Sequence, residues 1–205
     1  MWLSFWLNNA HFALGSFGTA VMLILAWLTF DAFLLKKSLK NFFLSLGFFL
    51  VAAGGVAHVL GVVGDLWLAV ASVVYILGLL FIITSLWFEQ GLQRPTFTAV
   101  IVLPAMASIL WKVNIVISIL LLAIVFLAFK ASTTGEQKLL KPFFKGFCFL
   151  AAFSVFSVFS SRMNGQGIIW VLEHVAQLFG FCFLLYWGWQ YLKLRMKEEM
   201  LLIFV

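Results

Sequence analysis

Charged residues are scarce in this chain, and so are cysteine, proline and histidine. Asp, Glu, Lys and Arg together make up only 10% of the 205 residues, and the sequence holds two cysteines, three prolines and three histidines. So few charges cannot cover the surface of a soluble domain of this size. The two cysteines, Cys148 and Cys182, lack the spacing of metal ligands. We expect both to be free thiols in the protein core.

Catalytic motifs are missing as well. The sequence contains no HExxH, no nucleophile elbow, no P-loop and no paired catalytic carboxylates, so we do not expect an enzyme. A microbial rhodopsin needs a lysine near the middle of its last helix, where this chain has Leu178, Phe179, Gly180 and Phe181. That family is therefore excluded.

Long apolar runs dominate what remains. Hydrophobic residues make up 65% of the chain and are separated by short polar breaks, which predicts an all-α, polytopic membrane helix bundle in a single domain. Most runs can cross a hydrocarbon layer of about 30 Å at about 1.5 Å per residue. The seven predicted transmembrane helices are residues 11–35, 41–63, 66–88, 96–111, 113–129, 146–161 and 167–192.

The basic residues give the bundle an orientation. Eleven of the thirteen Lys and Arg residues fall on one side of the predicted membrane, and short cytoplasmic loops carry such an excess. We therefore expect the N-terminus outside and the C-terminus in the cytoplasm of a bacterial or archaeal cell. The net charge of +6 then reflects contact with anionic lipids and not nucleic-acid binding. The eleven residues are Lys36, Lys37, Lys40, Arg94, Lys130, Lys138, Lys141, Lys145, Lys193, Arg195 and Lys197.

Small and aromatic residues predict how the helices pack. A three-residue repeat in the sixth span favours hydrogen bonds from its serines to a neighbouring helix. Glycines in the first three spans mark close helix contacts, and aromatic residues near the cytoplasmic boundary predict an interfacial belt. The serines are Ser154, Ser157 and Ser160; the glycines are Gly15, Gly18, Gly54, Gly55, Gly61 and Gly78; the belt is Trp87, Trp187, Trp189 and Tyr191.

Rare polar residues within the spans predict a ligand-binding site. Ionisable groups in a bilayer are costly and mark functional sites. His58, Asp65, Arg162, Glu173 and His174 all map toward the outer leaflet. His58 and His174 lie on different helices at a similar depth, about 7 to 11 Å below the boundary.

Three interpretations of this site stay open. The two histidines, His58 and His174, could be the axial ligands of a heme b, with Gly47, Gly54 and Gly61 forming a face that admits a flat macrocycle. They could instead be hydrogen-bonded packing residues, with Glu173 facing Arg162 or water. The same groups could also bind a quinone, a proton or a small ligand.

The last predicted helix leaves the membrane through aromatic residues directly into a charged segment. Residues 186–200 read YWGWQYLKLRMKEEM. This segment and the seven-span layout resemble the N-terminal membrane input modules of bacterial sensor histidine kinases. The resemblance implies that residues 193–205 form a cytoplasmic exit helix that transmits a signal through Lys193, Arg195, Lys197, Glu198 and Glu199.

The sequence therefore predicts a membrane-embedded sensory or signal-input module. Its expected partners are the lipid bilayer, a cytoplasmic output domain or protein, and a second copy in a homodimer. One alternative is a small b-type cytochrome or quinone-reactive electron-transfer subunit that uses His58 and His174. Another is a transporter or an assembly subunit. The apolar residues 200–205 suggest a further span in a longer protein, or a turn folding back onto the membrane.

Overall fold

The computed structural model describes residues 2–60, 65–90, 113–133, 140–162 and 168–203, all of which are helical except for the turn at residues 37–38. Each of the six helices is long and apolar enough to cross a membrane, which indicates an integral membrane protein. The predicted span 96–111 and Gly61 lie outside the described residues. The helices are α1 (Trp2–Lys36), α2 (Leu39–Leu60), α3 (Asp65–Gln90), α5 (Val113–Thr133), α6 (Leu140–Arg162) and α7 (Ile168–Ile203).

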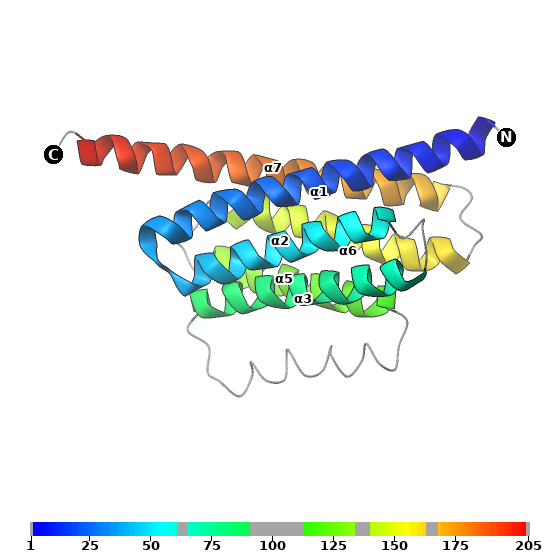
Figure 1. The fold of residues 1–205 in the computed structure, drawn as a ribbon, viewed down its shortest axis with the longest axis horizontal. Coiled ribbons are helices and arrows are strands. Elements are labelled where there is room, and N and C mark those ends of the chain that lie inside the picture. Colours follow the sequence, from blue (N-terminus) through cyan, green and yellow to red (C-terminus); the bar gives the residue numbers. More distant parts are fainter. Residues whose placement is uncertain (1, 61–64, 91–112, 134–139, 163–167, 204–205) are drawn as a thin grey trace.

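The six helices form a closed ring. Backbone contacts join α1 to α2, α2 to α3, α3 to α5, α5 to α6, α6 to α7, and α7 back to α1. Figure 1 shows α1 and α7 lying side by side along one edge of the bundle. Because Gly18 faces Phe181 and Gly188 faces Leu25, these two helices run in the same direction.

The two ends of the bundle differ in chemistry. We call one the lysine end, because it holds Lys36 in the last turn of α1, Lys130 in the last turn of α5, and Lys141 in the first turn of α6. The opposite end holds His58 in the last turn of α2 and His174 near the start of α7, and we call it the histidine end. Both histidines lie there because α2 is antiparallel to α1 and α7 is parallel to it.

Three helices extend beyond the predicted spans. The first span was predicted from residue 11, but α1 begins at Trp2. The sixth predicted span, 146–161, begins too late, since α6 starts at Leu140 and includes Pro142. A proline fits the first turn of a helix because its missing N–H has no partner there anyway. The last span, predicted at 167–192, continues without a break into the segment predicted as an exit helix, because α7 is one helix from Ile168 to Ile203.

Glycines bring neighbouring helices into backbone contact. A Cβ atom on Gly78 of α3 would lie 2.8 Å from the Gly47 carbonyl oxygen of α2, and one on Gly146 of α6 would lie 3.1 Å from the Gly180 carbonyl oxygen of α7. The prediction of close contacts is confirmed for Gly18, Gly54, Gly55 and Gly78. It is wrong for Gly15, where a Cβ would meet nothing within 4 Å.

Aromatic side chains fill the ring toward the lysine end. Phe48, Phe143, Phe147 and Trp187 are fully or almost fully buried, and the rings of Phe143 and Trp187 meet edge to face at 5.0 Å between centroids. The predicted interfacial belt is therefore wrong for Trp187 and for Trp87, which are core residues. The surrounding helices supply enough apolar contact to hold a tryptophan inside the bundle.

The cysteines are free thiols, as predicted, but they do not share one environment. Cys148 is half-buried, whereas Cys182 is exposed on the outer surface of α7. The expectation of a core position is wrong for Cys182, because α7 turns its other face toward α6 and α1.

Candidate functional site

Three adjacent polar side chains of α7 are buried at the histidine end. Glu173 is 6% exposed, His174 is 7% exposed and Gln177 is 8% exposed. They share a helix face with Gly180 and Phe181, which contact α6 and α1 respectively. Because Gly180 and Phe181 pack closely against α6 and α1, the same face of the preceding turns of α7 also lies inside the bundle. A carboxyl group, an imidazole and an amide are thereby removed from the lipid-facing surface.

Two further buried serines lie on α5 and α6, and α6 packs against α7. The Ser154 hydroxyl of α6 and the Ser118 hydroxyl of α5 form a buried hydrogen bond of 2.7 Å, which confirms the predicted interhelical role of Ser154. Ser154 lies eight residues above Gly146, and Glu173 lies seven residues from Gly180. At about 1.5 Å per residue, both lie roughly 11 to 12 Å from the glycine contact. We call Ser118, Ser154, Glu173, His174 and Gln177 the polar layer.

His174 has a defined orientation within this layer. Its Nδ1 atom lies 2.9 Å from the Trp170 carbonyl oxygen. A carbonyl only accepts, so Nδ1 carries a proton and donates. In a neutral imidazole the lone pair is then on Nε2, the nitrogen that takes up a proton or ligates a metal. The indole of Trp170 lies beside the imidazole, with 4.0 Å between the ring centroids.

Gln177 contributes an unused acceptor. Its Oε1 atom is buried and has no hydrogen-bond partner within the described part of the chain. Leaving a buried amide oxygen unpaired costs about 1 to 3 kcal/mol, and buried polar groups in proteins are nearly always satisfied. The orphaned oxygen therefore marks a position where a donor from a ligand or a water molecule would be stabilised.

Of the other residues predicted for the ligand site, His58 alone has a described side chain. His58 is exposed on α2, and α2 and α7 are not in backbone contact over the described ranges. The side chains of Asp65, at the first residue of α3, and of Arg162, at the last of α6, lie outside the described residues. A pairing of Glu173 with Arg162 stays a prediction.

The face that was expected to admit a heme is occupied by protein. A Cβ on Gly47 would lie 2.7 Å from Ile82, and one on Gly54 would lie 3.1 Å from Tyr75, both on α3. The glycines therefore seat a helix and do not line a space for a macrocycle. No group of three or more His, Cys, Asp and Glu side chains suited to a metal ion is found in the described ranges. Ligation of a heme b by His58 and His174 stays a prediction.

Gln177 and Ser118 were missed by sequence reasoning. Gln177 follows Glu173 by four residues, a spacing that places both side chains on one helix face. That spacing was the available signal. Ser118 has no comparable signal, because a single serine in an apolar helix commonly bonds to its own backbone, as Ser118 also does to the Asn114 carbonyl at 2.8 Å.

One helix connects the polar layer to the opposite end of the molecule. At 36 residues, α7 is about 54 Å long, and Figure 1 shows its C-terminal part projecting beyond the turn between α1 and α2. The Lys193 ammonium lies 5.3 Å from the centre of the exposed Trp189 ring. The side chains of Arg195, Lys197, Glu198 and Glu199 lie outside the described residues.

No protein-family model, curated protein or solved structure matches this chain.

Proposed function

We propose that the chain is a membrane-embedded sensory or signal-input module whose ligand site is the polar layer. In this proposal residues 96–111 supply a seventh span, the N-terminus lies outside the cell, and the lysine end faces the cytoplasm. The projecting part of α7 passes the signal to a cytoplasmic output domain or partner protein. The proposed ligand is a small polar molecule, a lipid-soluble redox carrier or a proton.

The proposal rests on one observation. The same helix, α7, carries both the candidate ligand site and the candidate signal-transmitting segment. Glu173, His174 and Gln177 are buried near its start, and the same unbroken helix continues to Ile203. Ionisable groups buried in a membrane protein are costly and mark functional sites. A helix transmits axial displacement or rotation because its backbone hydrogen bonds make it stiff along its length.

The proposed mechanism is a shift between two packings of α7. A Cβ added to Gly146 would lie 2.7 Å from Leu184 and 3.1 Å from the Gly180 carbonyl oxygen, so α6 and α7 are closely packed here. Closely packed interfaces change between discrete arrangements. A ligand that contacts Gln177 or Glu173 better in one arrangement than in the other raises the population of the first. The segment beyond Lys193 then moves relative to the end of α1.

This mechanism is tested with one spin label on each of α1 and α7. Cysteines replace Leu34 and Met196, both exposed near the lysine end, in a variant with Cys148→Ala and Cys182→Ala. The distance between the labels is measured in lipid nanodiscs at pH 8 and at pH 5, and with ubiquinone and menaquinone analogues. We expect at least one condition to change the populations of two distances.

Two variants test whether the polar layer causes the change in the populations of label distances. Glu173→Gln combined with Gln177→Leu is expected to abolish the response. Leu178→Ala, on the lipid-facing side of the same turns, is expected to retain it. A single distance distribution under all conditions, or a response that survives the double variant, contradicts the proposal.

The orientation of His174 bears on one rival function, a b-type cytochrome. Since Nδ1 donates to the Trp170 carbonyl, Nε2 is the nitrogen that would ligate iron. The test is an absorption spectrum of the purified, reduced protein. A b-type band lost in both His58→Ala and His174→Ala supports electron transfer, whereas a colourless protein removes this alternative.

A further inference from the structure

The crossing of α2 with α3 and the crossing of α6 with α7 share the same set of contacts. In each, a Cβ on the glycine of the first helix would lie close to the carbonyl oxygen of the glycine of the second, at 2.9 and 3.1 Å. The same Cβ would lie 2.7 Å from the side chain four residues after that second glycine, which is Ile82 in α3 and Leu184 in α7. The second crossing therefore repeats the first position by position. The glycines are Gly47 and Gly78 in the first crossing, and Gly146 and Gly180 in the second.

The sequence repeats together with these contacts. The motif GFxxxAA starts at the crossing glycine of α2 and again at that of α6, and the motif GxxFxxxxxW starts at the crossing glycine of α3 and again at that of α7. Near their ends, α1 and α5 share the motif FxAF. Each of the first three helices thus has a counterpart among α5, α6 and α7, in the same order. The matching segments are 47–53 and 146–152, 78–87 and 180–189, and 30–33 and 126–129.

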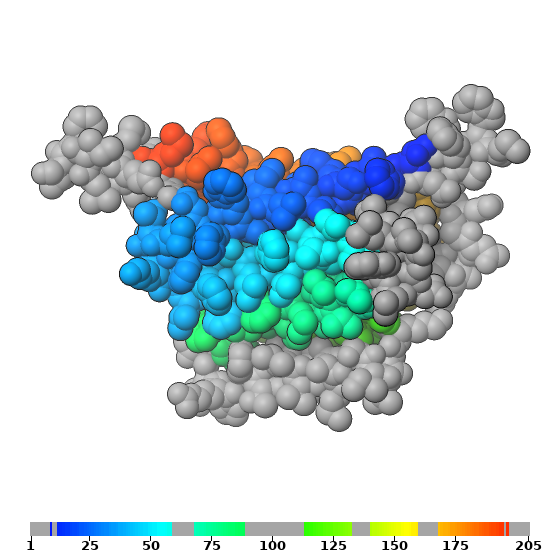
Figure 2. All heavy atoms as spheres, viewed as in Figure 1, coloured from blue at the N-terminus to red at the C-terminus, as the bar shows by residue number. Residues whose placement is uncertain are grey.

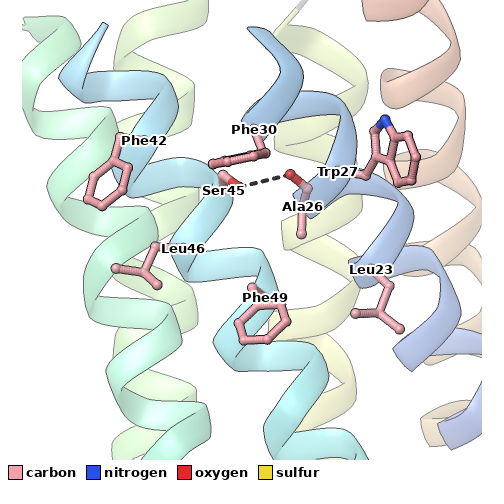
Figure 3. A pocket seen from close by; sticks show the side chains of 8 residues that line it. All are labelled: Leu23, Ala26, Trp27, Phe30, Phe42, Ser45, Leu46 and Phe49. Carbon is pink, nitrogen blue, oxygen red and sulfur yellow. Dashed lines mark hydrogen bonds between the residues drawn. The ribbon is translucent and has the colours of Figure 1, made fainter. Parts of the chain in front are cut away.

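The two sets of three helices are also arranged in the same way. Consecutive helices of each set are in contact, and Figure 2 shows α1, α2 and α3 side by side on one face. A hydrogen bond joins the first helix of each set to the second. Ser45 donates to the Ala26 carbonyl in one set (Figure 3), and Ser118 pairs with Ser154 in the other. Because α1 is parallel to α7, both sets run in the same direction along the bundle. We call α1, α2 and α3 the first unit, and α5, α6 and α7 the second unit.

We propose that the chain is a tandem duplication of one three-helix unit, and that its two units move against each other as rigid bodies. In membrane transporters built from repeats, the conformational change is largely a rigid-body rocking of one repeat against the other. The proposal rests on the proposed function for its trigger, which is the ligand at the polar layer. It places the change in the packing of α7 at its contact with α1, while α5 and α6 move together with α7.

The contacts within the units differ in kind from those between them. Within each unit the crossing glycines face backbone atoms, whereas the glycines at the contact of α1 with α7 face side chains. In the second unit, the ring centroid of Phe143 lies 4.8 Å from that of Phe147 and 5.0 Å from that of Trp187. Across the boundary, Phe48 of the first unit lies 6.4 Å from Phe143 and 6.1 Å from Trp187. Side chains can change rotamer, so rearrangement costs least at the boundary between the units.

Four labelling sites separate a movement of whole units from a movement of α7 alone. Cysteines are introduced in pairs at Leu34, Phe88, Phe126 and Met196, which are exposed positions on α1, α3, α5 and α7, in the variant without the native cysteines. Spin-label distances are measured in nanodiscs under the pH and quinone conditions given above. The pairs Leu34 with Met196 and Phe88 with Phe126 cross the boundary, whereas Leu34 with Phe88 and Phe126 with Met196 lie within one unit. We expect both crossing pairs to change by about 2 Å and both pairs within a unit to keep their distances.

A substitution at the boundary tests the movement without any ligand. Phe48→Leu removes the ring of the first unit that meets Phe143 and Trp187 of the second. It is expected to change the populations of distances in the two crossing pairs alone. Phe183→Leu is the matched control, because Phe183 stacks on Phe149 of its own unit at 5.6 Å between ring centroids. This control is expected to leave all four pairs unchanged.

The outcomes distinguish a failure of this inference from a failure of the proposed function. A change in either pair within one unit overturns the rigid units. If Phe126 with Met196 changes while Phe88 with Phe126 does not, α7 moves alone and the proposed function stands. If Phe48→Leu changes the crossing pairs but no pH or quinone condition does, the movement of the units stands and the proposed function fails. Constant distances in every pair, with Phe48→Leu included, overturn both.

Discussion

Several hydroxyl groups inside this bundle are paired with specific partners, although the buried Ser85 hydroxyl has none within the described residues. Thr29 donates to the Leu25 carbonyl of its own helix at 2.7 Å, whereas Ser45 and Ser154 bond to neighbouring helices at 2.8 and 2.7 Å. Bonds of the first kind satisfy a buried hydroxyl without joining two helices. Those of the second kind define how α1, α2, α5 and α6 are placed against one another.

The bond between Ser118 and Ser154 is expected to give a measurable coupling energy. Hydrogen bonds between membrane helices average about 0.6 kcal/mol and reach about 1.7 kcal/mol in double-mutant cycles. Unfolding free energies of Ser118→Ala, Ser154→Ala and the double variant should therefore show a coupling near this average. Ser132→Ala is the control, because Ser132 bonds to the Phe129 carbonyl of its own helix. A coupling no larger than that of the Ser132 and Ser154 pair would show that the serine bond adds no stability.

Gly78 and Gly15 should respond in opposite ways to the same substitution. A Cβ on Gly78 would lie 2.7 Å from the Val51 backbone nitrogen, whereas one on Gly15 would meet nothing within 4 Å. Gly78→Ala must separate α2 from α3, so we expect a loss of about 1 to 3 kcal/mol. Gly15→Ala is expected to be neutral or stabilising by about 0.5 to 1 kcal/mol, because alanine favours a helix. Thermal unfolding in detergent measures both, and equal effects would contradict the close contact.

At the scale of elements, the turn between α1 and α2 is unusually short. Lys37 adopts a left-handed conformation with φ of 45°, and its N–H donates to the Phe33 carbonyl at 2.7 Å. Helices often end in this way, but with glycine in the left-handed position. A lysine there carries strain, which the packing of Phe33 against Phe42, at 5.2 Å between ring centroids, helps to offset.

Replacing Lys37 with glycine should therefore stabilise the hairpin. The left-handed conformation costs a non-glycine residue about 1 to 2 kcal/mol, so we expect Lys37→Gly to raise the unfolding free energy by up to about 1 kcal/mol. Lys36→Gly, inside the end of α1, is the control and should lower it. The two variants remove the same charge, so an equal change in both would indicate an electrostatic cause instead.

At the scale of the whole molecule, the six-helix ring contains two similar helix pairs. The α2 and α3 pair crosses at Gly47 and Gly78, and the α6 and α7 pair crosses at Gly146 and Gly180, in both cases with a backbone carbonyl facing the glycine. Between them, Phe48 of the first hairpin meets Trp187 of the second at 6.1 Å between ring centroids. The two close crossings hold the hairpins rigid, and the aromatic core joins them.

The proposed orientation is tested by labelling intact cells. Single cysteines replace Asn9 and Met196, both exposed, in the variant without Cys148 and Cys182. A membrane-impermeant maleimide should label position 9 and leave position 196 unlabelled until the cells are opened. The excess of positive charge at the lysine end is the physical reason. Labelling of position 196 from outside would reverse the orientation.

Much of this architecture could be predicted from the sequence, and the reason is the cost of burying backbone polar groups in lipid. Apolar runs of this length can only be helices, so the six described helices match six of the predicted spans to within several residues. The largest differences at helix starts are those of α1 and α6, which begin at Trp2 and Leu140 and not at the predicted residues 11 and 146. At both places polar residues interrupt the apolar run, but the helical backbone continues through them.

The candidate site was only partly accessible to such reasoning. Glu173 and His174 stood out because charged and imidazole groups are rare in an apolar helix, which is a property of the sequence itself. The burial of Gln177, its unpaired oxygen and the bond between Ser118 and Ser154 depend on which faces of three helices meet. Residue spacing along one helix does not contain that information.

The sequence by itself thus determined that this is a membrane helix bundle, because apolar segments of this length can satisfy their backbone polar groups in lipid only as helices. Only the tertiary structure decided that Trp187 belongs to the core and that Gly47 and Gly54 pack against α3 and do not line a space for a macrocycle. The physical reason is that lipid solvates every apolar face equally well, so the choice of which faces touch is left to packing at glycines and to a few hydrogen bonds.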